Sequence, residues 1–176
     1  NVIGHDNKYN AHKWVVGQPR GMLHRAFSVM LFDKSGRLLL QQRASDKITF
    51  PDVWTNTCCS HPLYGMAPSE VDSQEATLKG QPLGVFHAAI RKLDHELGIA
   101  PTDLDVNKFA FVTRVHYAAA DTVTHGPDAP WGEHEVDYLL CYKLDIDGEQ
   151  LKITPHPEEV RDVRWVTQQE LFRLMD

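Results

Sequence analysis

The sequence predicts a mixed β-sheet flanked by helices, an α+β fold that a looser definition would place in the α/β class. Two observations lead to this prediction. Short apolar runs with strand-like patterns recur along the chain, and two segments between and after them carry helical spacing. With 176 residues and 42% hydrophobic content, the chain is long enough to bury one substantial core. We therefore expect a single domain over residues 1–176.

The first expected element is a hairpin. Ala26–Phe32 and Arg37–Gln42 are apolar runs, and Asp33–Gly36 between them has the composition of a turn. Residues 62–82, by contrast, are rich in Pro, Gly, Ser and charged side chains and have no sustained period. We expect a surface insertion at 63–82 that contains at most a short helical piece and takes no part in chemistry.

The clearest helix covers Leu83–Leu97, where apolar residues recur at helical spacing. Gly98 follows at the position where a left-handed C-terminal cap is expected. Lys108–Tyr117 and Glu133–Leu144 have the patterns of strands, and Ala118–Pro130 between them contains the Gly and Pro of a loop. The sequence of the second half of the chain therefore predicts a helix followed by two strands that pair with each other.

The last elements are a short strand, Val163–Val166, and a final helix. Thr167 and Glu170 have the spacing of a capping box for a helix that runs into Met175.

The longest apolar runs are far below the roughly 20 residues needed to cross a bilayer, so we expect no membrane span. A net charge of −6 provides no general attraction for nucleic acid, and an anionic ligand would need a local basic pocket.

Cysteine usage bears on the compartment. The three cysteines have no spacing typical of a disulfide framework or a four-thiolate zinc site, which favours a reducing environment. The chain opens at Asn1 without a hydrophobic or Arg-rich leader. We expect a monomer in the cytoplasm, or in a plastid or another organelle if a targeting segment has been removed.

A pair of carboxylates stands out in Trp131–Tyr138. Glu133 and Glu135 lie two residues apart, and in a strand such residues point to the same face. Adjacent carboxylates repel unless a cation neutralises them or one takes up a proton, and either is useful at an active site. An exposed strand edge is the alternative explanation. Imidazoles with two carboxylates would suit Zn²⁺, Mn²⁺ or a similar ion, although spacing alone does not rank the ten histidines.

The segment Thr55–Pro62 places a thiol near an imidazole. Cys59 precedes His61 by two residues, and Pro62 restricts His61 to extended geometry. Cys59 could be a nucleophile, an acid–base group or a small buried apolar residue. Its polar neighbours favour a functional role, whereas Cys58 would face the other way and serve the structure. A cysteine-protease signature is absent from the sequence around it.

Arg91–Ile99 resembles the end of the Nudix box, whose general form is Arg-Glu-U-x-Glu-Glu-x-Gly-U with U apolar. Lys92 and His95 stand where Nudix hydrolases carry metal-binding glutamates, and only Glu96 is retained. Because Lys92 brings positive charge to a place where cations would bind, the multi-Mg²⁺ cluster of pyrophosphohydrolysis should be weakened. The resemblance therefore implies a Nudix-like fold with altered chemistry.

Together with Thr55–Pro62, Trp131–Tyr138 and Gly21–Ser28, this helix resembles the type I isopentenyl-diphosphate isomerase family, in particular its eukaryotic-like branch. The resemblance extends from about Lys8 to Thr167. The family works in isoprenoid biosynthesis and interconverts isopentenyl and dimethylallyl diphosphate. It protonates one carbon and deprotonates another through a tertiary carbocation, without a redox cofactor.

The resemblance also implies roles for individual residues. Cys59 and Glu135 would be opposed acid–base groups, with Tyr117 assisting. The ligands of one divalent ion, Zn²⁺, Mn²⁺ or Mg²⁺, would be His12, His24, His61, Glu133 and Glu135. Glu96 would hold a second ion, Mg²⁺, that helps to bind the substrate diphosphate. The basic residues at substrate-binding positions would be Lys8, Arg43, Lys47 and Lys92.

One departure from the family concerns the end of the chain. The family continues past the last helix with a Pro-Trp-containing segment whose Trp helps to enclose the substrate, whereas this sequence ends at Asp176. We expect either that this extension is missing or that the pocket is closed differently. Two other functions stay open, namely a Nudix hydrolase of a nucleoside diphosphate derivative and a non-catalytic, degenerate Nudix binding domain.

Overall fold

The structure is a computed structural model that describes residues 2–14 and 21–175. Seven strands of these residues form one mixed sheet, with the order β3-β2-β1-β6-β5 along its main path and with β4 and β7 paired to β1 and β2. The strands are β1 (His24–Phe32), β2 (Leu38–Arg43), β3 (Trp54–Thr55), β4 (Cys58–Ser60), β5 (Ala110–Ala120), β6 (Gly132–Lys143) and β7 (Val160–Val166). The predicted mixed sheet and the predicted β1–β2 hairpin are both confirmed.

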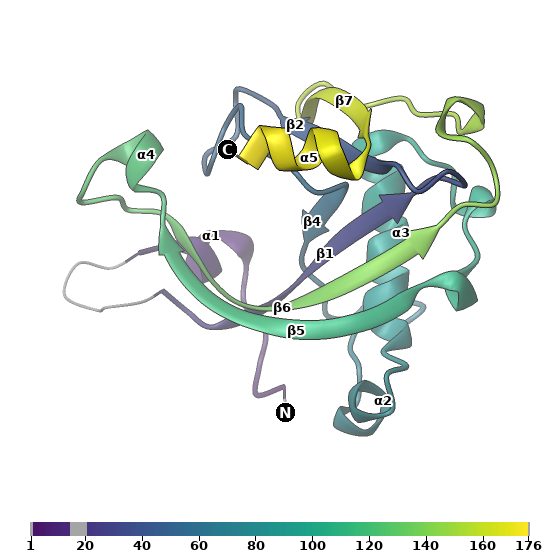
Figure 1. The fold of residues 1–176 in the computed structure, drawn as a ribbon. Coiled ribbons are helices and arrows are strands. Elements are labelled where there is room, and N and C mark those ends of the chain that lie inside the picture. The colour runs from purple at the N-terminus through teal and green to yellow at the C-terminus, as the bar shows by residue number, and fades with distance from the viewer. Residues whose placement is uncertain (1, 15–20, 176) are drawn as a thin grey trace.

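Helices flank this sheet (Figure 1). Those of the described residues are α1 (Lys8–His12), α2 (Gln74–Leu78), α3 (Leu83–Leu97), α4 (Thr122–His125) and α5 (Gln168–Met175). In Figure 1, β5 and β6 curve together across the molecule, with α3 beside the sheet and α1 close to β6. Within the part of the chain that the structure describes, every helix is too short or too polar to traverse a bilayer.

Strand β1 joins the two halves of the sheet. It runs parallel to β6, with His24 opposite Glu135, and antiparallel to β4, with Ser28 opposite Cys59. On the far side of β6, the antiparallel β5 places Tyr117 opposite Glu135. Because residues opposite each other in neighbouring strands project to the same face, all five of these side chains share one face of the sheet.

The other face of the sheet packs against α3. Phe27, Val29 and Leu140 of the sheet are fully buried there against Leu93 and Leu97 of the helix, in one hydrophobic cluster. Burying each such side chain stabilises the fold by roughly 1.5–3 kcal/mol before entropy losses are subtracted. The predicted helix is confirmed at both ends, and Gly98 ends it with φ of 61°, in the left-handed conformation that glycine adopts without strain.

The prediction for residues 108–130 was partly wrong. Lys108 lies in a short 3₁₀ turn, and β5 begins at Ala110 and continues to Ala120 because its last residues pair with the start of β6. The expected loop also contains α4, whose first turn is capped by the Asp121 side chain accepting from the Thr124 N–H. An Asx cap can start a single helical turn that has no apolar period to reveal it.

Smaller differences occur near both ends of the chain. The strand expected at Val163 starts at Val160, which pairs with Arg43 beyond a register shift that leaves Arg161 of β7 without a partner in β2. Helix α1, which was not predicted, spans only five residues and depends on the Asn7 side chain accepting from the Asn10 N–H. The capping box at Thr167 is confirmed, because its backbone N–H donates to Glu170 and its hydroxyl accepts from the Glu170 N–H.

Candidate active site

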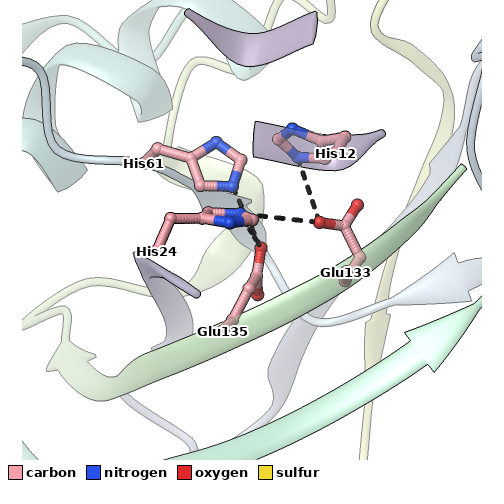
Figure 2. Close-up of side chains that lie close together, drawn as sticks. All are labelled: His12, His24, His61, Glu133 and Glu135. Carbon is pink, nitrogen blue, oxygen red and sulfur yellow. Dashed lines mark hydrogen bonds and ion pairs between the residues drawn. The ribbon is translucent and has the colours of Figure 1, made fainter. Parts of the chain in front are cut away.

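Five of the predicted metal ligands converge on one point (Figure 2). Glu133 and Glu135 project from the same side of β6 toward three imidazoles that come from α1, from β1 and from the segment after β4. One potential ligand atom from each residue lies within 4.8 Å of all the others. The residues are His12, His24, His61, Glu133 and Glu135. The strand geometry proposed for the two glutamates is therefore confirmed.

The orientation of two imidazoles suits a cation at this cluster. Nδ1 of His12 lies 2.7 Å from the Lys8 carbonyl and Nδ1 of His24 lies 2.8 Å from the Met22 carbonyl, so each Nδ1–H donates to the backbone. In the neutral ring, Nε2 then carries a lone pair. Nε2 of His12 lies 3.0 Å from a Glu133 oxygen, and two such acceptors repel unless a proton or a metal ion lies between them.

Two buried atoms of the cluster support the same interpretation. Among the described residues, Nε2 of His24 and Oε2 of Glu133 are buried without a hydrogen-bond partner. Unpaired buried polar atoms cost about 1–3 kcal/mol each, so a site that keeps them is expected to serve a ligand. The donor set of three imidazoles and two carboxylates fits a divalent ion.

Glu135 is the most strongly perturbed carboxylate of the cluster. The Tyr117 hydroxyl donates to its Oε2 at 2.5 Å, and Nε2 of His61 lies 3.0 Å from its Oε1. Burial alone would raise the pKa of Glu135, but its polar contacts with His24, His61 and Tyr117 outweigh burial and hold the pKa well below its usual range. Burial and the Glu135 charge raise the pKa of Tyr117. The pair therefore consists of a neutral phenol and an ionised carboxylate.

The adjacent thiols face opposite sides of the sheet, as predicted. Cys58 is fully buried in the α3 core, whereas Cys59 is partly exposed and its thiol donates to Oδ1 of Asn56 at 3.3 Å. The Asn56 amide is itself fixed, because its Nδ2 donates to the carbonyls of Val29 and Cys58. Burial and the negative charge of Glu96 raise the pKa of Cys59 to about 11, so the thiol carries its proton at neutral pH.

Glu96 lies outside the five-residue cluster. It is buried on α3, where Nζ of Lys92 lies 3.0 Å from its Oε1 and the Gln41 amide donates to its Oε2 at 3.2 Å. His95, the other residue that departs from the Nudix box, is more exposed and has Nδ1 3.2 Å from Nζ of Lys92. The positive charge expected from the sequence is therefore present beside the one retained glutamate.

The predicted basic residues come from separate segments of the chain. Lys8 lies on α1, and its pKa is lowered by desolvation and by the positive charges of Lys47 and Lys92. Lys47 forms an ion pair with Glu159. Arg43, on β2, uses its guanidinium to donate to the carbonyls of Thr49 and Phe50.

Sequence reasoning missed two acidic residues at this site. Asp137 is buried two residues beyond Glu135, and its pKa is raised to about 6 by burial and by the Glu135 charge, against the hydrogen bond from Ser28. The two-residue spacing that singled out Glu133 and Glu135 in a strand also includes Asp137. Glu159 had no such signal, because its contacts with Lys47 and His95 join segments far apart in the sequence.

The comparisons with known proteins agree with the fold. The NUDIX domain family matches residues 82–176, which is more than half of the chain. The chain belongs to the Nudix family. Among solved structures, a NUDIX hydrolase from Alicyclobacillus acidocaldarius has a TM-score of 0.61 at 9% identity and covers 87% of this chain and 82% of its own. At that identity the likeness establishes the Nudix fold alone.

Curated relatives are more similar in sequence. Isopentenyl-diphosphate Delta-isomerase I of Camptotheca acuminata is 45% identical over 99% of this chain. Isopentenyl-diphosphate delta-isomerase idi1 of Aspergillus fumigatus is 52% identical over 88% of it. This chain spans 66% of the length of the first relative and 53% of the second.

Proposed function

We propose that this Nudix protein interconverts isopentenyl and dimethylallyl diphosphate in isoprenoid biosynthesis. One observation carries the proposal. Cys59 pairs with Ser28 and Glu135 pairs with His24 of the same strand, β1, so both side chains lie on one face of the sheet. A protonated thiol and an ionised carboxylate on that face support an acid–base pair. An allylic shift of a double bond needs one proton donor and one proton acceptor placed together. The names of the two curated relatives support the same reaction.

The proposed reaction balances as a proton transfer in each direction. A proton adds to the terminal methylene carbon of isopentenyl diphosphate, which leaves a tertiary carbocation. Loss of a proton from the neighbouring methylene then forms the internal double bond of dimethylallyl diphosphate. Cys59 and Glu135 are the two acid–base groups, and they exchange roles in the reverse direction. Tyr117 assists by donating its hydrogen bond to Glu135.

A divalent ion completes the proposed site. The three imidazoles and two carboxylates of the cluster would hold Zn²⁺, Mn²⁺ or Mg²⁺, and Glu96 would help to bind a second ion, Mg²⁺, with the diphosphate. Bound at the cluster, such an ion supplies positive charge that keeps the glutamates ionised. Two imidazoles are already oriented for this by their bonds to the Lys8 and Met22 carbonyls.

The diphosphate would be bound by the local cations of an otherwise acidic protein. We assign this role to Lys8, Arg43, Lys47 and Lys92, and the positive charges of Lys47 and Lys92 lower the pKa of Lys8. Charge-assisted hydrogen bonds from such groups are about twice as strong as neutral ones. We further propose a monomer of one domain that acts in the cytoplasm, although some plant relatives are named chloroplastic.

The test is turnover of isopentenyl diphosphate by the metal-replete protein, followed as formation of the acid-labile allylic product. We expect activity in the wild type and none above background in Cys59→Ala. Cys141→Ala is the matched control, because Cys141 is a half-buried thiol on β6 whose strand partners are Met30 and Ala110. Turnover by Cys59→Ala near the wild-type rate would overturn the assignment of the thiol.

A Nudix hydrolase acting on a nucleoside diphosphate derivative is the second candidate, favoured by the family assignment. Lys92 and His95 stand against it, because they remove two carboxylates from the positions where a hydrolase binds its metal ions. Phosphate release from a panel of nucleoside diphosphate derivatives separates the two reactions. Ligand affinity without any turnover would instead indicate a binding domain.

A further inference from the structure

The insertion at 63–82 contains a buried carboxylate that the proposed function does not use. Glu70 is 3% exposed in a segment whose side chains are otherwise mostly exposed. Its carboxylate forms a two-pronged ion pair with Arg91 of α3, with Nε to Oε1 at 2.6 Å and Nη2 to Oε2 at 2.9 Å. A paired, hydrogen-bonded geometry of this kind fixes direction as well as distance.

This ion pair holds the backbone on both sides of Pro62. Nη2 of Arg91 donates to the carbonyl of His61 at 3.2 Å, and Oε2 of Glu70 accepts from the Leu63 N–H at 2.8 Å. Pro62 has a fixed φ and offers no N–H, so these two bonds and the proline ring together constrain the segment. From this constrained backbone, the His61 ring reaches Glu135.

We propose that Glu70 is a positioning residue for the metal cluster. Acting through Arg91, it fixes the backbone of His61 and with it the direction in which the imidazole presents Nε2 to the divalent ion. The inference rests on the divalent-ion part of the proposed function. It also assigns a function to the insertion, which the sequence had led us to expect would take no part in chemistry.

A second contact of the insertion provides a control. Asp72 accepts from the N–H groups of Gly84 and Val85 at 2.7 and 2.9 Å, and so caps the start of α3 without touching Arg91. The packing at this point is close, since a Cβ at position 84 would lie 2.7 Å from the backbone carbon of Glu70. Asp72 therefore serves the helix, whereas Glu70, two residues earlier, serves His61.

The experiment is a Zn²⁺ titration of the full chain against a competing chromophoric chelator, with thermal unfolding measured in parallel. Removing the outer partner of a metal ligand typically costs 10- to 100-fold in affinity. We expect that loss in Glu70→Gln and in Arg91→Lys, which keeps the charge but cannot form the two-pronged pair. Asp72→Asn should lower the unfolding temperature and leave Zn²⁺ affinity within twofold of the wild type.

Several outcomes would overturn the inference. Glu70→Gln and Arg91→Lys could bind Zn²⁺ within twofold of the wild type, or Asp72→Asn could lose as much affinity as they do. If Glu70→Gln does not fold, Arg91→Lys alone decides by the same criterion. A wild type that fails to bind Zn²⁺ overturns Zn²⁺ as the ion of the cluster together with this inference, whereas normal wild-type binding with unchanged variants overturns only the inference.

Discussion

The two faces of the sheet are built from alternate residues of the same strands, yet they have opposite environments. On the α3 face, Val29 and Leu140 are fully buried in hydrocarbon. On the other face, Glu135 and Asp137 are buried, and Ser28 of β1 donates a hydrogen bond to Asp137. The comparison teaches that burial alone does not separate structural from functional residues here. The polar face carries the unpaired atoms of His24, Glu133 and Asp137, and Glu135 and Asp137 there have displaced pKa values.

The largest expected effect is on the polar face. Glu135→Gln removes the ionised carboxylate but keeps the shape and a hydrogen-bonding group, so the fold should survive while isomerisation falls by about 10³-fold or more. Steady-state kinetics with isopentenyl diphosphate and a thermal unfolding scan measure the two effects separately. A variant with near-normal turnover would remove the distinction between the two faces at this residue.

Shortening a buried side chain on the α3 face should lower stability and leave activity largely intact. Leu93 is fully buried, and Leu93→Ala would leave a cavity that lowers the free energy of unfolding by about 3 kcal/mol. Activity per folded molecule and Zn²⁺ affinity should remain close to the wild type at a temperature where the variant stays folded. Urea unfolding measures the first effect. Loss of metal affinity in the folded variant would show that the two faces are coupled.

The buried carboxylate of Asp33, which lies outside the metal cluster, should make the free energy of unfolding depend on pH. Asp33 is fully buried in the β1–β2 turn; burial would raise its pKa, but hydrogen bonds from Ser35, Arg37 and Gly148 lower it from 3.8 to about 2. The folded pKa lies below the unfolded value, so its stabilisation is complete above about pH 4 and is lost as the pH falls toward 2. We expect it to contribute about 1–2 kcal/mol.

The difference between wild type and Asp33→Asn isolates this carboxylate. Urea unfolding at pH 5 should show the variant to be less stable, and the gap should close near pH 2. Metal affinity at neutral pH should be unchanged, because Asp33 lies in the β1–β2 turn and contacts none of the cluster residues. If the difference in unfolding free energy between wild type and Asp33→Asn were constant across this pH range, ionisation of Asp33 would contribute nothing to stability.

The smallest expected effect sharpens the comparison within one dipeptide. Cys58→Ala removes a buried sulfur from the α3 core and should cost about 1 kcal/mol of unfolding free energy without loss of turnover. Cys59→Ala should abolish turnover and leave the free energy of unfolding nearly unchanged. Chemical unfolding and kinetics of both variants test this directly. An equal loss of activity in the two variants would show that the face of the sheet on which a thiol lies does not determine its role.

Local signals in the sequence predicted those elements that local physics determines. Helix Leu83–Leu97 carried its own period and its own glycine cap, and the Glu133–Glu135 pair carried the alternation of a strand. Helices α1 and α4 were missed because each is a single turn set by one side-chain cap, at Asn7 and Asp121. Such caps are common in loops and do not predict a helix by themselves.

The convergence of the site could not be derived from spacing. His24 meets Glu135 through the parallel pairing of β1 with β6, which joins segments more than 100 residues apart. The resemblance to the isomerase family supplied His12 and His24, whereas residue patterns had left them among ten histidines. Glu70 was missed because its role depends on Arg91, 21 residues later, on another element.

The opposed acid–base pair is tested most directly by NMR of isopentenyl diphosphate incubated with the metal-replete protein in D₂O. We predict dimethylallyl diphosphate with solvent deuterium in a methyl group for the wild type, and no deuterated product for Cys59→Ala or Glu135→Gln. Release of phosphate without a deuterated allylic product, or deuterium incorporation that survives both substitutions, would contradict a site in which these two side chains move the protons.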